Sequence, residues 1–138
     1  MILLVEDDPD HEVLAIRALR KANVANEIQV AHDGTEALEY LNAAVSGAKP
    51  MPQLVLLDLK LPKVDGLEVL RSIRVAEKTA LLPVVVLTSS DEERDIVSSY
   101  RLGVNSYIRK PVNFTDFAEA TRQLGMYWLL LNQCPPVQ

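Results

Sequence analysis

The sequence predicts an α/β fold in which a parallel sheet of five strands is doubly wound by five helices. Short runs of leucine and β-branched residues alternate along the chain with longer segments of helical period, as in successive βαβ units with right-handed crossovers. Most of the short runs are almost continuously apolar, which is typical of strands covered by helices on both faces. A chain of 138 residues fits a single domain of this kind.

The apolar runs and their flanking residues give the element boundaries. Strands are expected near residues 2–5, 27–31, 53–57, 83–87 and 105–108. Helices are expected near residues 9–22, 34–46, 66–77, 91–102 and 113–131. The second strand alternates apolar and polar residues, which suits an edge strand. Two prolines and a glycine within residues 46–52 predict the longest loop.

Residues typical of helix ends support this division. Asp8 stands before a proline that can occupy the first turn of the first helix, which makes it a candidate N-cap. Ser90 or Asp91 is expected to cap the fourth helix, and Gly103 fits its left-handed stop. The core-facing stripe of the first helix is predicted to contain Val13, Ile16 and Leu19, with Ala15 as a further candidate.

The composition excludes several classes of function. A net charge of −5 argues against binding to nucleic acid, which requires a basic face, and to an anionic membrane surface. No apolar run approaches the roughly 18 residues of a spanning helix. The chain starts almost at once with a strand rather than a signal peptide, and Cys134 has no second cysteine to pair with. We therefore expect a cytoplasmic protein that contacts neither membrane nor nucleic acid.

Acidic residues directly follow two of the apolar strands. Glu6 and Asp7 come after the first strand, and Asp58 comes after the third. The carboxyl ends of parallel strands meet at one edge of the sheet, where such folds bind ligands, so these side chains are expected to lie together. Neighbouring carboxylates repel one another unless a cation fills the site, and an all-oxygen site favours Mg²⁺. For Asp8, the interpretation as a helix cap is favoured.

Two further strand ends carry polar residues. Thr88 ends the fourth strand, and Lys110 follows the fifth strand just before a proline. Each alone is better interpreted as an ordinary strand-end threonine or a solvated lysine. Together with the acids, and in this chain order, they indicate a site for an anion, in which a hydroxyl donates a hydrogen bond and an ammonium supplies a point charge.

The motifs at these strand ends are residues 2–8, 57–58 with 61–66, 87–89 and 103–111. Together they resemble the receiver domain of the two-component response regulators. The resemblance covers residues 1–125 and implies a flavodoxin-like sheet in the order 2-1-3-4-5. Residues 126–138 are then an extension of the last helix and a tail.

The resemblance also implies a phosphoacceptor and a metal site. Asp58 matches the aspartate that accepts a phosphoryl group from a histidine kinase. Asp7 and Asp58 match the side-chain ligands of Mg²⁺, with Glu6 acting through water and the carbonyl of Lys60 completing the set.

Three more residues match the parts of a receiver that respond to the phosphoryl group. Thr88 and Lys110 match the pair that contacts it, and Tyr107 matches the aromatic switch residue. We expect phosphorylation to draw Thr88 inward and to admit Tyr107 into the vacated space, as a population shift between two arrangements.

A narrower resemblance is to the small stand-alone regulators paired with phytochrome-type histidine kinases. The loop at 46–52, the acidic stretch 91–95 and the tail 127–132 carry it. Lys60 departs from this subgroup, which often has an amide side chain two residues after the acceptor. We expect a cation there to change the lifetime of the phosphorylated state.

The output is expected to be binding, because no output domain follows the receiver-like part in this sequence. The last predicted helix has a core-facing stripe and further apolar residues off that stripe, which require a second buried face. We expect a homodimer through the fourth helix, fifth strand and fifth helix, with residues 126–138 as an arm. The alternative is that the tail folds back onto its own domain.

Two other classes of α/β protein share parts of the pattern. A haloacid-dehalogenase-type phosphatase also has an aspartate after an apolar strand, but it usually has a second aspartate where Lys60 stands. A flavodoxin-like redox protein would need a phosphate loop where Glu6, Asp7 and Asp8 would repel the FMN phosphate. Both classes are disfavoured. We expect that the protein is not an enzyme and that it promotes only its own phosphotransfer and autodephosphorylation.

Overall fold

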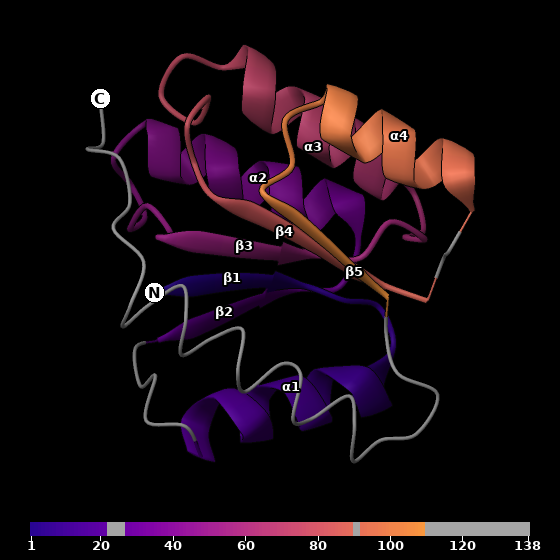
Figure 1. Ribbon diagram of the computed structural model, residues 1–138. Coiled ribbons are helices and arrows are strands. Elements are labelled where there is room, and N and C mark those ends of the chain that lie inside the picture. The colour runs from indigo at the N-terminus through magenta and orange to yellow at the C-terminus, as the bar shows by residue number, and fades with distance from the viewer. Residues whose placement is uncertain (22–26, 90–91, 110–138) are drawn as a thin grey trace.

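The computed structural model describes residues 1–21, 27–89 and 92–109, and within them it shows a parallel sheet with helices on both faces (Figure 1). The strands are β1 (Ile2–Val5), β2 (Ile28–Ala31), β3 (Leu54–Leu57), β4 (Val84–Thr88) and β5 (Ser106–Arg109). All neighbouring strands are parallel, and their order is β2-β1-β3-β4-β5. This is the order that the sequence predicts, with β2 at an edge.

The helices divide between the two faces of the sheet. α1 (Pro9–Lys21) covers one face, and α2 (Gly34–Val45), α3 (Gly66–Val75) and α4 (Glu93–Arg101) cover the other (Figure 1). The fifth predicted helix, near residues 113–131, and the predicted boundary at residue 125 lie outside the described residues. Within the described ranges, no helix combines the length and the apolar character needed to span a bilayer.

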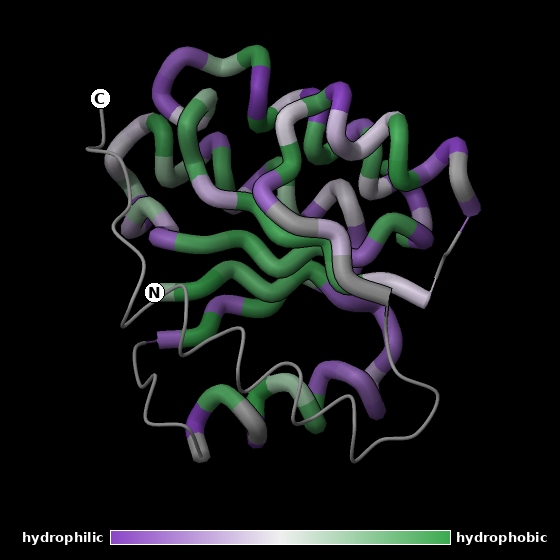
Figure 2. Tube along the Cα trace, viewed as in Figure 1, coloured by the Kyte–Doolittle hydropathy of each residue, from purple (hydrophilic) through white to green (hydrophobic). Residues whose placement is uncertain are grey.

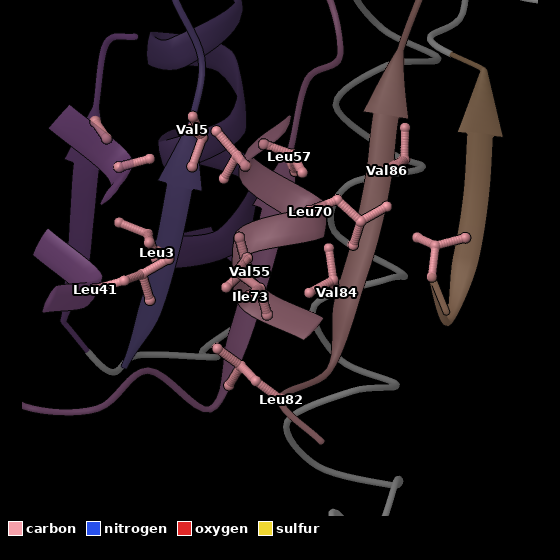
Figure 3. Packing of buried hydrophobic residues seen from close by; sticks show 14 of the residues in the cluster. Leu3, Val5, Leu41, Val55, Leu57, Leu70, Ile73, Leu82, Val84 and Val86 are labelled. Carbon is pink, nitrogen blue, oxygen red and sulfur yellow. The ribbon is translucent and has the colours of Figure 1, made fainter. Parts of the chain in front are cut away.

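Two apolar clusters, one on each face, hold the helices against the sheet. Alternate residues of a strand point to opposite faces, so Leu3 and Val55 pack with Leu70 and Ile73 of α3 (Figure 3). The alternate strand residues pack with α1 in the second cluster: Ile2, Leu4, Leu54, Leu56, Ala15 and Leu19. Figure 2 shows the result, since the central strands are apolar along most of their length. Each fully buried leucine or valine contributes about 1.5–3 kcal/mol relative to an exposed one.

The start of α1 agrees with the predicted cap, but its predicted core stripe is wrong at one position. The Asp8 carboxylate accepts hydrogen bonds from the amides of Asp10 (2.9 Å) and His11 (3.3 Å), as an N-cap does. Val13, however, is 50% exposed. Ala15 and Leu19 are buried as predicted, and a residue two positions from Ala15 points almost the opposite way on a helix.

The two ends of α4 also differ in how well the sequence predicts them. Gly103 has a φ of +80°, so the predicted left-handed stop is confirmed. The helix starts at Glu93, with Glu92 as its N-cap, and Glu92 makes no side-chain capping hydrogen bond. The predicted caps, Ser90 and Asp91, lie outside the described residues. Several residues of this acidic run are almost equally suitable as the N-cap, so the sequence pattern alone does not define the first residue of α4 well.

Arg74 ties α3 to the segment before β4 and to the segment between α4 and β5. Its guanidinium donates to the carbonyls of Leu82 (2.7 Å) and Ala80 (3.2 Å) in the segment before β4. It also donates twice to the Gly103 carbonyl after α4 (3.0 and 2.8 Å) and to Asn105 Oδ1 (3.2 Å). Burial lowers the pKa of Arg74 below its usual value. The C-terminal end of α4 is therefore anchored firmly to α3 and to the sheet.

Candidate functional site

The carboxyl ends of β1, β3 and β4 bring three polar side chains to one rim of the sheet. The Glu6 amide donates to the Ala31 carbonyl (3.0 Å), and the Asp58 amide donates to the Val5 carbonyl (3.1 Å), so both residues continue the strand ladders. Thr88 is the last residue of β4. Only 3% of Glu6, 7% of Asp58 and 0% of Thr88 is exposed. The strands therefore fix where these side chains lie.

Three carboxylates form an acidic cluster at this rim. One oxygen from each of Glu6, Asp7 and Asp58 lies within 4.8 Å of the others, as predicted from the strand ends. Glu6 and Asp58 are buried, whereas Asp7 is exposed. Like charges this close, two of them removed from water, are unfavourable without a counter-ion. A hard divalent cation with open coordination positions fits this all-oxygen set.

Two donors hold the Asp58 carboxylate in place. The Thr88 hydroxyl donates to Asp58 Oδ1 at 2.7 Å in a buried hydrogen bond, and the Lys60 amide donates to the same oxygen at 3.2 Å. The Thr88 hydroxyl thus contacts the Asp58 carboxylate before any phosphorylation. A buried charged oxygen binds a nearby donor strongly, which explains this orientation. The further inward movement of Thr88 on phosphorylation stays a prediction.

The loop between β3 and α3 packs tightly behind Asp58. The Gly66 amide donates to the Leu59 carbonyl at 3.0 Å. A Cβ atom on Gly66 would lie 2.3 Å from the Asp58 carbonyl oxygen, so glycine is required there. Asp65 caps α3 by accepting from the Leu67 amide at 3.3 Å. This packing fixes the backbone on the C-terminal side of Asp58.

Two lysines join the same loop to helices on either side. Lys60 Nζ lies 3.3 Å from Asp95 Oδ2 of α4, and Lys63 Nζ lies 3.4 Å from Asp33 Oδ2. The hydrogen bond to Asp95, and then its Coulomb attraction, raise the pKa of Lys60. Asp33 caps α2 by accepting from the Glu36 amide at 2.8 Å. That hydrogen bond is the main cause that lowers the pKa of Asp33, and Lys63 adds to it.

The sequence did not single out two residues that the structure places beside the site. Asp95 is 5% exposed and pairs with Lys60. Its burial depends on how α4 packs, so an acidic stretch gives no local signal of it. His11 Nδ1 lies 3.8 Å from Glu6 and 3.7 Å from Asp8, and it is charged only if protonated.

The last two predicted residues are Tyr107 of β5 and Lys110. Tyr107 pairs with Val86 across the sheet and is partly buried against the core cluster. Lys110 lies outside the described residues. The structure thus brings Glu6, Asp7 and Asp58 together with Thr88, and it turns the Lys60 side chain toward α4.

The geometry is that of a known family. The sequence matches the model of the response regulator receiver domain over residues 2–122. The chain belongs to this family. Because the receiver model spans residues 2–122, the phosphatase and flavodoxin alternatives are set aside.

Receivers of known sequence and structure are similar over almost the whole chain. FilR2 of Methanothrix harundinacea is 42% identical over 135 residues, 98% of this chain and 87% of FilR2. Rcp1 of Synechocystis sp. is 38% identical over 130 residues, 94% of this chain and 88% of Rcp1.

Two solved structures are also close. The Mn(2+)-bound form of Rcp1 has a TM-score of 0.91 at 37% identity and covers 98% of both chains. The phosphorylated cyanobacterial phytochrome response regulator RcpA has a TM-score of 0.91 at 39% identity, covering 98% of this chain and 97% of that chain. The similarity therefore extends over nearly the full length of Rcp1 and RcpA.

Proposed function

We propose that this receiver accepts a phosphoryl group on Asp58 from a histidine kinase and then signals by changing its contacts with other proteins. The observation that carries this proposal is the environment of Asp58. Asp58 is 7% exposed, and its carboxylate accepts a hydrogen bond from Thr88 at 2.7 Å and lies in the acidic cluster. The name of RcpA as a phosphorylated phytochrome response regulator supports a phytochrome-type kinase as the partner.

The acidic cluster is proposed to hold Mg²⁺. Asp7 and Asp58 would supply side-chain oxygens, Glu6 would act through water, and the carbonyl of Lys60 would complete the set. Mg²⁺ keeps several waters and tolerates few carboxylates, which suits a cluster of three. When bound, the ion offsets negative charge on the carboxylates and on phosphoryl oxygens. The Mn(2+)-bound form of Rcp1 supports a divalent cation at such a site.

The chain's own residues would prepare Asp58 for attack. In the transfer, an Asp58 oxygen forms a bond to phosphorus while the phosphorus–nitrogen bond of the kinase phosphohistidine breaks. The transition state carries charge on three equatorial oxygens. Thr88 and the Lys60 amide hold the carboxylate in one orientation, which removes part of the entropic cost of alignment. Lys110 is proposed to contact a phosphoryl oxygen.

The phosphorylated state would end by hydrolysis in the same site. Water that attacks the phosphorus breaks the acyl phosphate, which releases inorganic phosphate and restores the Asp58 carboxylate. We propose this autodephosphorylation as the chain's only turnover, so the protein acts as a switch rather than as an enzyme on other substrates. Lys60 is proposed to change the rate of this hydrolysis. The Tyr107 side chain on β5 is proposed to change its burial when Asp58 is phosphorylated.

The output surface is proposed to be α4, β5 and the predicted fifth helix, with residues 1–125 as the receiver and 126–138 as a dimer arm. On α4, Val97 is 42% exposed and Tyr100 is 54% exposed, so apolar side chains are available to a second copy. Light scattering over a concentration series, with and without phosphorylation, tests this. A monomer under both conditions would exclude the homodimer.

Intact-mass measurement tests the acceptor. After incubation with Mg²⁺ and a small acyl- or amido-phosphate donor, the parent protein should gain one phosphate, and Asp58→Asn should gain none. Asp65→Asn is the matched control, because Asp65 is an exposed acid of the same loop and asparagine can keep its cap. Phosphate on Asp58→Asn, or its loss in Asp65→Asn alone, would contradict the assignment.

A further inference from the structure

The ion pair between Lys60 and Asp95 connects the proposed acceptor to α4. The Lys60 amide donates to Asp58 Oδ1 at 3.2 Å, so the backbone of this residue lies at the acceptor. Its ammonium instead lies 3.3 Å from Asp95 Oδ2. The Lys60 side chain is 54% exposed and the Asp95 side chain 7%. A flexible, exposed lysine is therefore directed by a fixed, buried carboxylate.

Two negative groups are available to this ammonium. Asp95 is one, and the acidic cluster beside the Lys60 backbone is the other. In the resting structure Asp95 holds the ammonium. A phosphoryl group on Asp58 would add a charge of about −1.5 to −2 and new acceptor oxygens on the cluster side. The balance between the two groups would then shift away from Asp95, which carries a single charge.

The two ends of α4 make different contacts in the described part of the chain. Its C-terminal end is anchored by two hydrogen bonds from Arg74 to the Gly103 carbonyl, at 3.0 and 2.8 Å. At its N-terminal end, Glu92 makes no side-chain capping hydrogen bond, and Lys60 bonds Asp95 within the first turn. Loss of the Lys60 contact would thus remove one tie of the first turn of α4, while the Arg74 bonds at its last turn stay in place.

We propose that Asp95 is a positioning residue, which keeps the Lys60 ammonium away from the acceptor until Asp58 is phosphorylated. The phosphoryl group then takes Lys60 from Asp95 and releases the first turn of α4. The inference rests on the proposed function, because the exchange requires phosphate on Asp58. Its resting half, the hold of Asp95 on Lys60, does not require phosphate.

Divalent-cation binding to the unphosphorylated protein tests the resting half. Asp95→Asn frees the Lys60 ammonium to approach the acidic cluster, so Mn²⁺ should bind about two- to five-fold more weakly, the range of a solvent-exposed ion pair. If Asp95 acts through Lys60, most of this effect should disappear in a Lys60→Gln background, as a double-mutant cycle measures. Equal weakening in both backgrounds would overturn the proposal.

Lys63→Gln is the matched control for charge. Lys63 belongs to the same loop and carries the same charge, but it pairs with Asp33 on the α2 side at 3.4 Å. The effect of Asp95→Asn on Mn²⁺ affinity should persist unchanged in the Lys63→Gln background. Disappearance of the effect there as well would mean that the net charge of the loop, rather than the Lys60 contact, sets the affinity. Thermal unfolding of each variant verifies that it is folded.

Phosphoryl lifetime and amide exchange test the second half. Asp95→Asn should lengthen the half-life of the phosphorylated protein about two- to five-fold, because Lys60 then has no competing partner in Asp95, and Lys60→Gln should abolish this gain. On phosphorylation, amide exchange should rise at Ile96 and Val97 but not at Gly103. Unchanged exchange in the first turn, in protein that mass shows to be phosphorylated, would overturn the release. Absence of phosphate on Asp58 would instead contradict the proposed function.

Discussion

Replacing Arg74 by methionine is expected to lower the free energy of unfolding by about 3 kcal/mol. The guanidinium donates partly buried hydrogen bonds to the carbonyls of Leu82 (2.7 Å) and Ala80 (3.2 Å), each contributing about 1 kcal/mol, because the carbonyl loses its partner. The more exposed bonds to Gly103, at 3.0 and 2.8 Å, contribute about 0.5 kcal/mol each. Methionine keeps an apolar stem, so the change measures hydrogen bonding and charge rather than packing.

Urea unfolding followed by circular dichroism measures this loss, because a single domain of this size usually unfolds in two states. With a slope of about 2 kcal/mol per molar urea, the midpoint should fall by about 1.5 M. Arg71→Met is the matched control in the same helix. Arg71 is 59% exposed and pairs with Glu68 at 3.4 Å on the surface, so its loss should stay below about 0.5 kcal/mol.

Arg74→Lys separates the fork geometry from the charge. One ammonium cannot reach carbonyls on both sides of α3 at once, so lysine should restore less than half of the stability lost in Arg74→Met. A loss below about 1 kcal/mol for Arg74→Met would refute the reasoning. Equal losses for Arg71→Met and Arg74→Met would refute it too.

Three further substitutions test other parts of the structure. Ser99→Ala should raise the free energy of unfolding by about 0.5–1.5 kcal/mol, because the buried Ser99 hydroxyl has no hydrogen-bond partner in the described part of the chain. A lower free energy of unfolding, measured with urea, would contradict this. Gly66→Ala should lower the free energy of unfolding by about 1–3 kcal/mol, because the added Cβ would lie 2.3 Å from the Asp58 carbonyl oxygen. It should also reduce the gain of phosphate measured by intact mass. Unchanged stability and phosphate gain would show that the loop can shift to accommodate the Cβ. Asp33→Asn keeps the cap but removes a carboxyl group whose pKa in the folded protein lies below the ordinary 3.8. A lowered folded pKa stabilises the fold above the unfolded pKa, and this contribution is lost as pH falls through the folded pKa. The stability gap between Asp33→Asn and the parent should therefore be full at neutral pH and close as pH drops below 3.8, and a pH-independent gap would argue against the charge.

The strands and most helix ends are predictable because their signals are local. The apolar runs that become β1, β3 and β4 need only their own residues to be recognised, and the carboxyl-end rule then places Asp7, Asp58 and Thr88 at one rim. The cap at Asp8 and the stop at Gly103 are also set by residues within one turn.

The features that escaped prediction depend on contacts between distant segments. Asp95 belongs to an acidic stretch that looks like an ordinary solvated helix start, and only the packing of α4 buries it beside Lys60. Val13 fits an apolar stripe by spacing, but the position of α1 on the sheet turns it outward. The inward orientation of Thr88 depends on a buried carboxylate 30 positions earlier.

The lysines near the acceptor in sequence leave the acidic cluster negative. Lys60 reaches Asp95 on α4, and Lys63 reaches Asp33 at the start of α2, so each ties the loop to a flanking helix. The proposed function requires a site negative enough to bind a divalent cation before the phosphoryl group arrives. It also requires a cation near enough to respond once that charge is added. We infer that Asp95 lets Lys60 meet both requirements, because the Asp95 carboxylate holds the ammonium at 3.3 Å while the Lys60 amide stays bonded to Asp58.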